Sequence, residues 1–253
     1  MSLKKKIKSG QLTIGSWITI GHPTIAEVMA KAGFDWLAID MEHGPVNFAQ
    51  CQELIRTVDL CEIPALVRVG ANDPLLIKQA MDAGAQGVIV PMVNSKKDAE
   101  KAVTSVKYPP EGKRGVGLTR ASDYGTKFDE YKKWVRDESI VIVQIEHIEA
   151  AKNIKEILNT KGVDAFIIGP YDLSGSMGIP GAFKDPGLLS VIEEILNAAK
   201  LMKVTAGFHS IPTDLKFVKE KIKQGFQLIA YSVDFLLLGD QCRNGLKFLK
   251  HRK

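Results

Sequence analysis

Eight short apolar runs recur along the chain at regular intervals, and helix-length segments separate them. The runs are continuous rather than alternating, as in "IPALVRV" and "IVIVQIE". Strands of this kind have both faces covered, as in parallel sheets flanked by helices. The runs comprise residues 12–20, 34–40, 63–69, 87–93, 140–146, 163–169, 204–210 and 226–233.

The intervening segments have helical spacing, and several close on a glycine that can end a helix, namely Gly33, Gly84 and Gly225. Eight strand–helix units in 253 residues predict an α/β protein, a closed (β/α)8 TIM barrel that residues 1–253 form as a single domain. An open doubly wound sheet is the alternative. It would need a G-x-G-x-x-G turn after an early strand, and the sequence has none.

One segment departs from this regular pattern. The sequence "YPPEGKRGVGLTRASDYG" (108–125) is long, rich in Gly and Pro, and carries Lys113, Arg114 and Arg120. Long loops in compact domains usually serve function or assembly. We therefore expect a βα insertion loop at this position.

Composition and charge narrow the class of protein. The chain is 45% hydrophobic and 25% charged, as a globular protein with a large core should be. Most of its net charge of +5 lies in "KKKIKSG" and "KFLKHRK", at the two ends, with His251 in the second. We expect solvated termini there; attraction to anionic partners or substrates is the alternative. A basic fringe of this kind does not predict nucleic-acid binding.

The cysteines and the N-terminus bear on location. Cys51, Cys61 and Cys242 are odd in number and none has a ligand spacing, so neither a disulfide framework nor a zinc site is expected. The N-terminus is charged where a secretory signal needs an apolar region, and no apolar run approaches the roughly 18 residues of a membrane span. We expect a cytoplasmic protein in a reducing compartment, without a membrane partner.

Titratable side chains gather where the predicted strands end. In a (β/α)8 barrel these carboxyl ends form one face, which carries the active site. The residues at these ends are Asp40, Glu42, His43, Arg68, Gln144, Glu146, His147, Asp172, His209 and Asp234. The sequence therefore predicts that this face is the functional one.

Glu146 and Asp172 follow neighbouring strands. Two carboxylates there could hold a hard divalent cation and leave positions open for water and substrate, or each could be a helix cap or an ion-pair partner. Arg68 could pair with Asp40 or Glu42, or its guanidinium could stabilise a developing enolate oxygen. His43 could move a proton or be a structural residue.

Missing residues also restrict the chemistry. A Schiff-base enzyme needs a lysine that projects from a strand end, and none of the eight runs contains lysine. A nucleophile elbow, a Walker loop and a Cys/His pair are absent as well. Covalent imine catalysis is therefore not expected.

Taken together, these segments resemble the HpcH/HpaI aldolase family, which are metal-dependent pyruvate aldolases with a phosphoenolpyruvate/pyruvate-domain-like barrel. The resemblance covers nearly the whole chain, in order. It runs from "GSWITIGHP" through "AGFDWLAIDMEHGP", "RVG", "YPPEGKRGVG", "VQIE" and "GPYDLSGSMG" to "YSVD". The pairing of "VQIE" with "GPYDLS" is its most specific part.

The resemblance implies a role for each matching residue. Glu146 and Asp172 correspond to ligands of a divalent cation, which would be Mg²⁺, Mn²⁺ or Co²⁺. Arg68 corresponds to the residue that holds the keto oxygen of pyruvate, and His43 to the catalytic base. The remaining matches are Asp82, the acidic partner of that histidine, and the substrate-binding set Asp40, Gln144, Gly169, Pro170, Tyr171 and Arg120.

The family also implies an assembly, because its members form hexamers that exchange the last helix. Asp82 ends a helix that leads into a strand, so we expect it at the opposite face of its own barrel and in contact with a neighbouring chain's His43. One departure stands out: His209 occupies a strand end that is often apolar in the family.

The expected function is reversible cleavage of a 4-hydroxy-2-oxo acid, of the 2-keto-3-deoxy acid type, to pyruvate and an aldehyde. A decarboxylase of the oxaloacetate type would use the same enolate chemistry without a base for a hydroxyl proton. A non-catalytic barrel that binds keto acids is the alternative from another class of protein.

Overall fold

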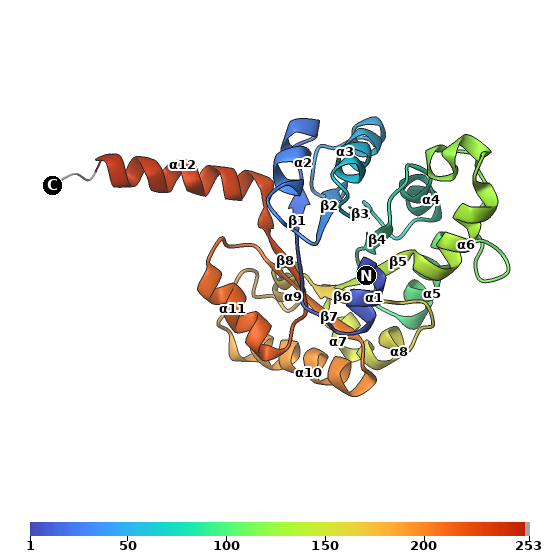
Figure 1. Cartoon of the computed structure of the whole chain (residues 1–253). Helices are drawn as coiled ribbons and strands as arrows, with labels where there is room; N and C mark the ends of the chain where they lie inside the picture. Colours follow the sequence, from blue (N-terminus) through green and yellow to red (C-terminus); the bar gives the residue numbers. More distant parts are fainter. Residues whose placement is uncertain (251–253) are drawn as a thin grey trace.

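The computed structural model describes residues 1–250 and shows a closed barrel of eight parallel strands (Figure 1). Each strand pairs with the next along the chain, and β1 pairs with β8 to close the barrel. The strands are β1 (Thr13–Ile18), β2 (Trp36–Asp40), β3 (Ala65–Arg68), β4 (Gly87–Val90), β5 (Ile140–Ile145), β6 (Ala165–Ile168), β7 (Thr205–Ser210) and β8 (Leu228–Val233). All eight lie within the predicted runs, so the predicted (β/α)8 barrel is confirmed.

Helices surround the barrel, and most begin at a residue that suits a helix N-terminus. Asn47 and Gln50 form a capping box at α3, and the Asp73 carboxylate accepts from two backbone N–H groups at α4. The helices are α1 (Leu3–Lys8), α2 (Pro23–Ala30), α3 (Phe48–Leu60), α4 (Pro74–Asp82), α5 (Lys96–Val106), α6 (Phe128–Glu138), α7 (Ile148–Lys152), α8 (Ile154–Leu158), α9 (Pro170–Ser176), α10 (Pro186–Met202), α11 (Leu215–Gln224) and α12 (Asp234–Lys250), with a 3₁₀ segment η1 (Arg120–Gly125). None of the helices within residues 1–250 has both the length and the apolar character needed to cross a membrane.

The core has two layers. An outer layer lies between the strands and the helices, and an inner layer fills the barrel with side chains such as Trp36, Leu66 and Ile142. Gly15 makes room for the largest of these, because a Cβ there would come within 2.0 Å of the Trp36 ring. A packed interior of this kind leaves only the end of the barrel open for a ligand.

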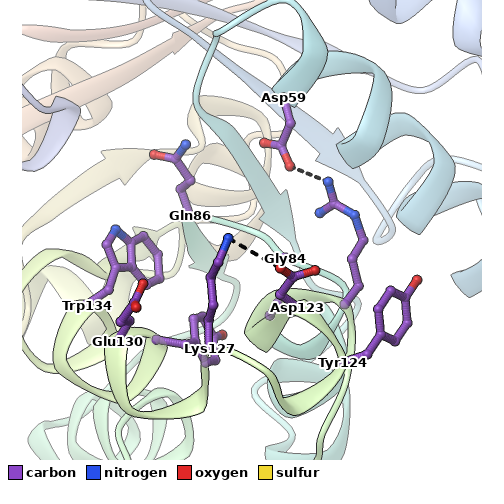
Figure 2. A pocket seen from close by; sticks show the side chains of 11 residues that line it. Asp59, Gly84, Gln86, Asp123, Tyr124, Lys127, Glu130 and Trp134 are labelled. Atoms are coloured by element: carbon purple, nitrogen blue, oxygen red, sulfur yellow. Dashed lines mark hydrogen bonds and ion pairs between the residues drawn. The ribbon is translucent and has the colours of Figure 1, made fainter.

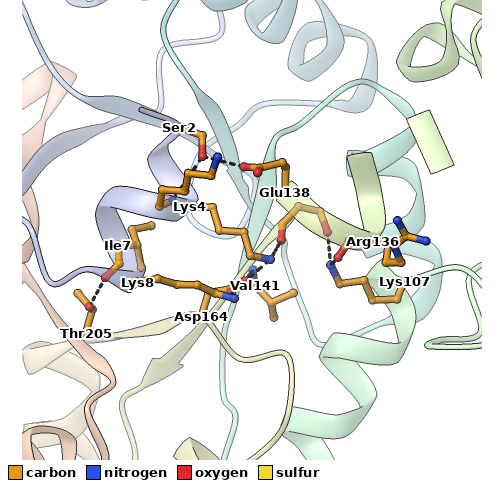
Figure 3. A network of polar contacts seen from close by, with 12 residues as sticks. Ser2, Lys4, Ile7, Lys8, Lys107, Arg136, Glu138, Val141, Asp164 and Thr205 are labelled. Carbon is orange, nitrogen blue, oxygen red and sulfur yellow. Dashed lines mark hydrogen bonds and ion pairs between the residues drawn. The ribbon is translucent and has the colours of Figure 1, made fainter. Parts of the chain in front are cut away.

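The first helix covers the end of the barrel where the strands begin, and Figure 3 shows the polar contacts that Ser2, Lys4 and Ile7 make there. Leu3 and Ile7 of α1 are buried among the inner side chains. Lys4 is also buried, donates to the Ser139 carbonyl oxygen over 2.6 Å, and lies 3.3 Å from the Asp164 carboxylate. The prediction of a solvated N-terminal segment is therefore wrong for these residues, because the two apolar side chains of the helix enter the barrel and its buried lysine is paired.

The inserted segment also lies elsewhere than predicted. It connects α5 to α6, ahead of β5, so it is an αβ connection rather than a βα loop. Its residue Arg120 bonds to the Ala83 carbonyl oxygen at the end of α4, and Asp82 ends that helix. The segment therefore belongs to the end of the barrel where the strands begin. His251 lies outside the described residues.

Candidate active site

The carboxyl ends of β2 and β3 carry a buried ion pair. Arg68 donates from Nε to Asp40 Oδ1 over 2.9 Å and from Nη2 to Asp40 Oδ2 over 2.6 Å. The guanidinium carbon lies 4.3 Å from the centre of the Trp17 ring, on β1. Strand register places Asp40 beside Arg68, so the sheet itself aligns the pair. Arg68 is thus fixed at the face that the sequence analysis predicted to be functional.

Asp40 remains ionised in this setting. Burial alone would raise its pKa, but the hydrogen bonds and charge of Arg68 and two backbone N–H donors together lower the pKa of Asp40 below its usual 3.8. These donors are the N–H groups of Glu42 and His43, at 3.0 and 3.2 Å from Oδ1. Asp40 therefore orients both Arg68 and the turn after β2.

Glu42 lies beside this pair with a perturbed carboxyl group. Burial raises the pKa of Glu42 to about 7; the charge of Arg68 opposes this, and those of Glu146, Asp40 and Asp172 add to it. Its Oε2 atom is 3.4 Å from Arg68 Nε but has no hydrogen-bond partner in the described chain. The sequence placed Glu42 at this strand end as a possible ion-pair partner of Arg68, and the structure shows this contact.

Glu146 and Asp172 supply two further carboxylates. Glu146 follows β5, is buried, and accepts from the Met92 N–H over 2.7 Å and from the Gln144 side-chain amide. Asp172 lies in the first turn of α9. Burial raises the pKa of Glu146, and the nearby charge of Asp172 adds to this rise, although the Gln144 and Met92 donors oppose it. The two carboxylates are therefore close enough to repel each other.

This arrangement fits a hard divalent cation. Gly169 leaves room at Glu146, since a Cβ there would lie 3.0 Å from Glu146 Oε2. Buried Gln144 Oε1 and Glu42 Oε2 lack partners within residues 1–250, as expected where a further polar group binds. Those residues contain no group of three or more His, Cys, Asp or Glu side chains arranged for a metal. Two carboxylates suit an ion that keeps several positions for water and substrate.

The structure does not bring every predicted residue to this cluster. His43 is there: its side chain is 62% exposed, and Nε2 lies 3.7 Å from Glu42 Oε2. Asp82 lies at the opposite end of the barrel, as expected, where it pairs with buried Arg114. Arg114 itself lies over the Tyr108 and Tyr131 rings.

Arg120 is also at that opposite end. It donates to Asp59 over 2.7 Å and to the Ala83 carbonyl oxygen over 3.0 Å, on the wall of a cavity of about 800 Å³ (Figure 2). The prediction that Arg120 contacts the same pocket as Arg68 is therefore not met within one chain. Its position after α5, rather than after a strand, is the physical reason.

Three other strand-end residues have structural partners. His147 Nδ1 accepts from the Glu149 N–H as the cap of α7, and His22 caps α2 in the same way. The Asp234 carboxylate accepts from the N–H groups of Thr19 and Ile20 and so joins the end of β1 to α12.

Two aromatic residues complete the pocket walls. Tyr171 follows buried Pro170 at the start of α9, is 49% exposed, and packs edge-on against Phe183 at 4.6 Å. Trp17, beneath Arg68, was missed by the sequence analysis because it is an apolar residue within a strand. Its ring centre lies 5.1 Å from that of His209.

Comparisons with known proteins identify the family and support the fold. The family model described as HpcH/HpaI aldolase/citrate lyase matches residues 13–240. Hydroxypyruvate/pyruvate aldolase of Sagittula stellata is 37% identical over 236 residues, which cover 93% of this chain and 92% of that protein. The 4-hydroxy-2-oxo-heptane-1,7-dioate aldolase of Escherichia coli is 37% identical over 239 residues, 94% of this chain and 90% of that protein. A crystal structure of an HpcH/HpaI aldolase/citrate lyase family protein from Burkholderia cenocepacia J2315 has a TM-score of 0.93 at 32% identity and covers 98% of both chains.

Proposed function

The chain belongs to the HpcH/HpaI aldolase/citrate lyase family and is a carbon–carbon lyase, and on this premise we propose that it is a divalent-metal-dependent pyruvate aldolase. It would reversibly cleave a 4-hydroxy-2-oxo acid of the 2-keto-3-deoxy acid type to pyruvate and an aldehyde. The observation that carries this proposal is a buried, oriented Arg68 at the same barrel face as the carboxylates of Glu146 and Asp172. The alternative of a non-catalytic binding barrel is contradicted by the aldolase relatives.

Glu146 and Asp172 would hold the cation, which would be Mg²⁺, Mn²⁺ or Co²⁺. When bound, the ion supplies positive charge that stabilises the enolate formed as the bond between C3 and C4 breaks. Glu146 is buried and Asp172 is exposed near it, so the two negative charges together favour a bound cation. The Gln144 side-chain amide and the Met92 N–H each donate to one Glu146 oxygen and so fix the orientation of this carboxylate.

Arg68 would bind the keto oxygen of pyruvate. Its Nε and Nη2 groups are committed to Asp40, and no hydrogen bond from its Nη1 occurs among residues 1–250. That free donor can meet the oxygen on which negative charge develops, and Asp40 and Trp17 hold the guanidinium so that it need not reorganise. Gln144 and the segment Gly169, Pro170 and Tyr171 would line the rest of the pyruvate pocket.

His43 would act as the base. It is half-exposed beside Glu42, so it can exchange protons with solvent and reach a ligand above the barrel. In the cleavage direction it would take the proton from the C4 hydroxyl group as the C3–C4 bond breaks. Asp82 of the same chain cannot assist it from the other end of the barrel, so that contact would come from a second chain.

The last helix supports such an assembly. In Figure 1, α12 projects away from the barrel, and among its apolar residues Phe235, Leu238, Leu246, Phe248 and Leu249 are exposed. Large apolar side chains that are exposed together in this way indicate a protein–protein interface in which they are buried. We propose that α12 packs on a second copy of the chain in a homo-oligomer, with a hexamer as the expected form.

One experiment tests the activity and separates it from the closest alternative. Pyruvate is incubated with a panel of aldehydes and Mg²⁺, Mn²⁺ or Co²⁺, and condensation products are measured with and without EDTA. A decarboxylase of the oxaloacetate type would use the same enolate without a base. The His43→Ala variant should therefore lose aldol cleavage and keep oxaloacetate decarboxylation. A variant that retains both activities, or a wild type that only decarboxylates, would exclude the aldolase.

A further inference from the structure

His209 has no part in the function proposed above, yet it lies at the same face of the barrel. It belongs to β7, which stands across the barrel from β3 and Arg68. Its ring packs on Trp17 at 5.1 Å between centres, and Trp17 in turn lies against the Arg68 guanidinium at 4.3 Å. The three side chains therefore form one continuous contact from β7 through β1 to β3.

The His209 imidazole lacks a partner of its own. Its Nε2 atom is buried and has no hydrogen bond within the described chain. An unpaired buried nitrogen costs free energy, and such an atom at a ligand face indicates that a ligand supplies the missing partner. The Trp17 ring is tilted by 57° to the imidazole, and its own indole N–H is likewise buried without a hydrogen bond among residues 1–250.

The surroundings also keep the ring neutral. Burial and the positive charge of Arg68 lower the pKa of His209 to about 3, although Asp40 opposes this. A neutral imidazole offers one N–H donor and one lone pair as acceptor. A hydroxyl group, which both donates and accepts, matches this pair of functions, whereas an ionised carboxylate can only accept.

His209 also lies on a particular side of the pocket. Glu146, Asp172 and Gln144 are proposed to bind pyruvate and its cation. His43 is proposed to transfer the proton of the C4 hydroxyl group, which derives from the aldehyde. The charged groups that act on His209 are Arg68, Asp40 and His43. His209 also lines a cavity of about 460 Å³ together with Pro170, Tyr171 and Phe183 of the neighbouring segment. This cavity gives the acceptor aldehyde space next to the pyruvate-binding residues.

We propose that His209 contacts the acceptor aldehyde through a hydrogen bond and selects acceptors that carry a hydroxyl group on the carbon next to the carbonyl. This inference rests on the proposed pyruvate aldolase function. His209 is a specificity residue in this account: it leaves formation of the pyruvate enolate to the other side chains and discriminates among aldehydes.

The test compares two acceptors of similar size, glycolaldehyde and propanal, in condensation with pyruvate and Mn²⁺. The ratio of their kcat/KM values is measured for the wild type, His209→Leu, His209→Gln and His22→Asn. His22→Asn removes another strand-end histidine and keeps a side chain that can cap α2. Exchange of the pyruvate methyl protons in D2O, followed by NMR, reports separately on the enolate half of the reaction.

We expect His209→Leu to lower the ratio about tenfold, which corresponds to ~1.4 kcal/mol, with unchanged proton exchange. His209→Gln should recover part of the ratio, and His22→Asn should not change it. An unchanged ratio in His209→Leu would overturn the inference and leave the aldolase intact. Loss of proton exchange in that variant would also overturn it, because His209 would then serve the pyruvate half. A wild type that neither exchanges protons nor condenses any aldehyde would overturn the proposed function itself.

Discussion

Arg68 and Asp40 are joined by two parallel hydrogen bonds, of 2.9 and 2.6 Å, while both side chains are buried. We expect Arg68→Ala to lower turnover on the order of a hundredfold or more, because a fixed donor to a developing oxyanion contributes about 3–4 kcal/mol. Arg68→Lys should also be impaired, since a lysine cannot reproduce the paired donors. Steady-state kinetics measure the loss, with surface Arg56→Ala as the control; normal cleavage by Arg68→Ala would refute this role.

Glu146→Gln and Asp172→Asn should each abolish tight binding of Mn²⁺, because each removes one of the two negative charges that favour the ion. Isothermal titration calorimetry measures this directly, and circular dichroism checks the fold. Glu149→Gln is the matched control, since Glu149 is exposed on the same loop–helix segment. Equal Mn²⁺ affinity in all three variants would disprove the assignment of the ligands.

His209 should make the protein sensitive to mild acid. Its pKa in the folded chain is about 3, below the ordinary 6.5, so the unfolded chain binds the extra proton as pH falls below 6.5. Wild-type stability should therefore fall relative to His209→Leu by about 1.4 kcal/mol per pH unit, or roughly 2 kcal/mol between pH 7.5 and 5. Urea unfolding of both proteins at the two pH values tests this, and parallel changes in stability would contradict it.

The contact between α1 and the barrel interior should contribute strongly to stability. Ile7 is fully buried, so Ile7→Ala should lower the free energy of unfolding by about 2–5 kcal/mol. Lys5→Ala changes an exposed residue of the same helix and should have little effect. Urea titration compares the two; equal stabilities would show that the helix does not close the barrel in solution.

The projecting helix gives a prediction about assembly. Phe248→Asp together with Leu249→Asp should reduce the oligomer to smaller species, because charges would replace the exposed apolar side chains that are proposed to be covered. Size-exclusion chromatography with light scattering measures the mass. Lys250→Asp, at the end of the same helix, is the control, and a monomeric wild type would refute the proposed assembly.

The fold was predictable because each strand lies in a compact apolar run, and several of these runs, such as those with Asp40, Arg68 and Glu146, carry a polar residue at or near the end. Arg68 and Glu146 could be placed at one face from sequence alone, since parallel strands align their carboxyl ends. Trp17 could not be identified in this way. Its contact with Arg68 joins β1 to β3 inside the barrel, and such a contact between strands that are not neighbours cannot be derived from the sequence of either strand. The same limit applies to His209, whose neighbours on β1 and β3 are distant in sequence.

The predictions that a single chain does not bear out involve segments without strand periodicity. The basic N-terminal stretch reads as solvated, yet Lys4 is buried because Asp164 and the Ser139 carbonyl oxygen meet its ammonium group. Arg120 was linked to the substrate by resemblance, whereas its partner Asp59 lies on α3. In both cases a pair of residues far apart in sequence decides the position, and no local pattern encodes such a pair.

Closure of the barrel has a consequence for how the chain is made. β1 can complete its hydrogen bonding only with β8, so residues 13–18 have one free edge until residues 228–233 have left the ribosome. During most of synthesis that edge, including Trp17 and its neighbours, is open to pairing with other nascent chains. Fragments that end before β8 should therefore aggregate or recruit chaperones, even when every earlier strand and helix is present.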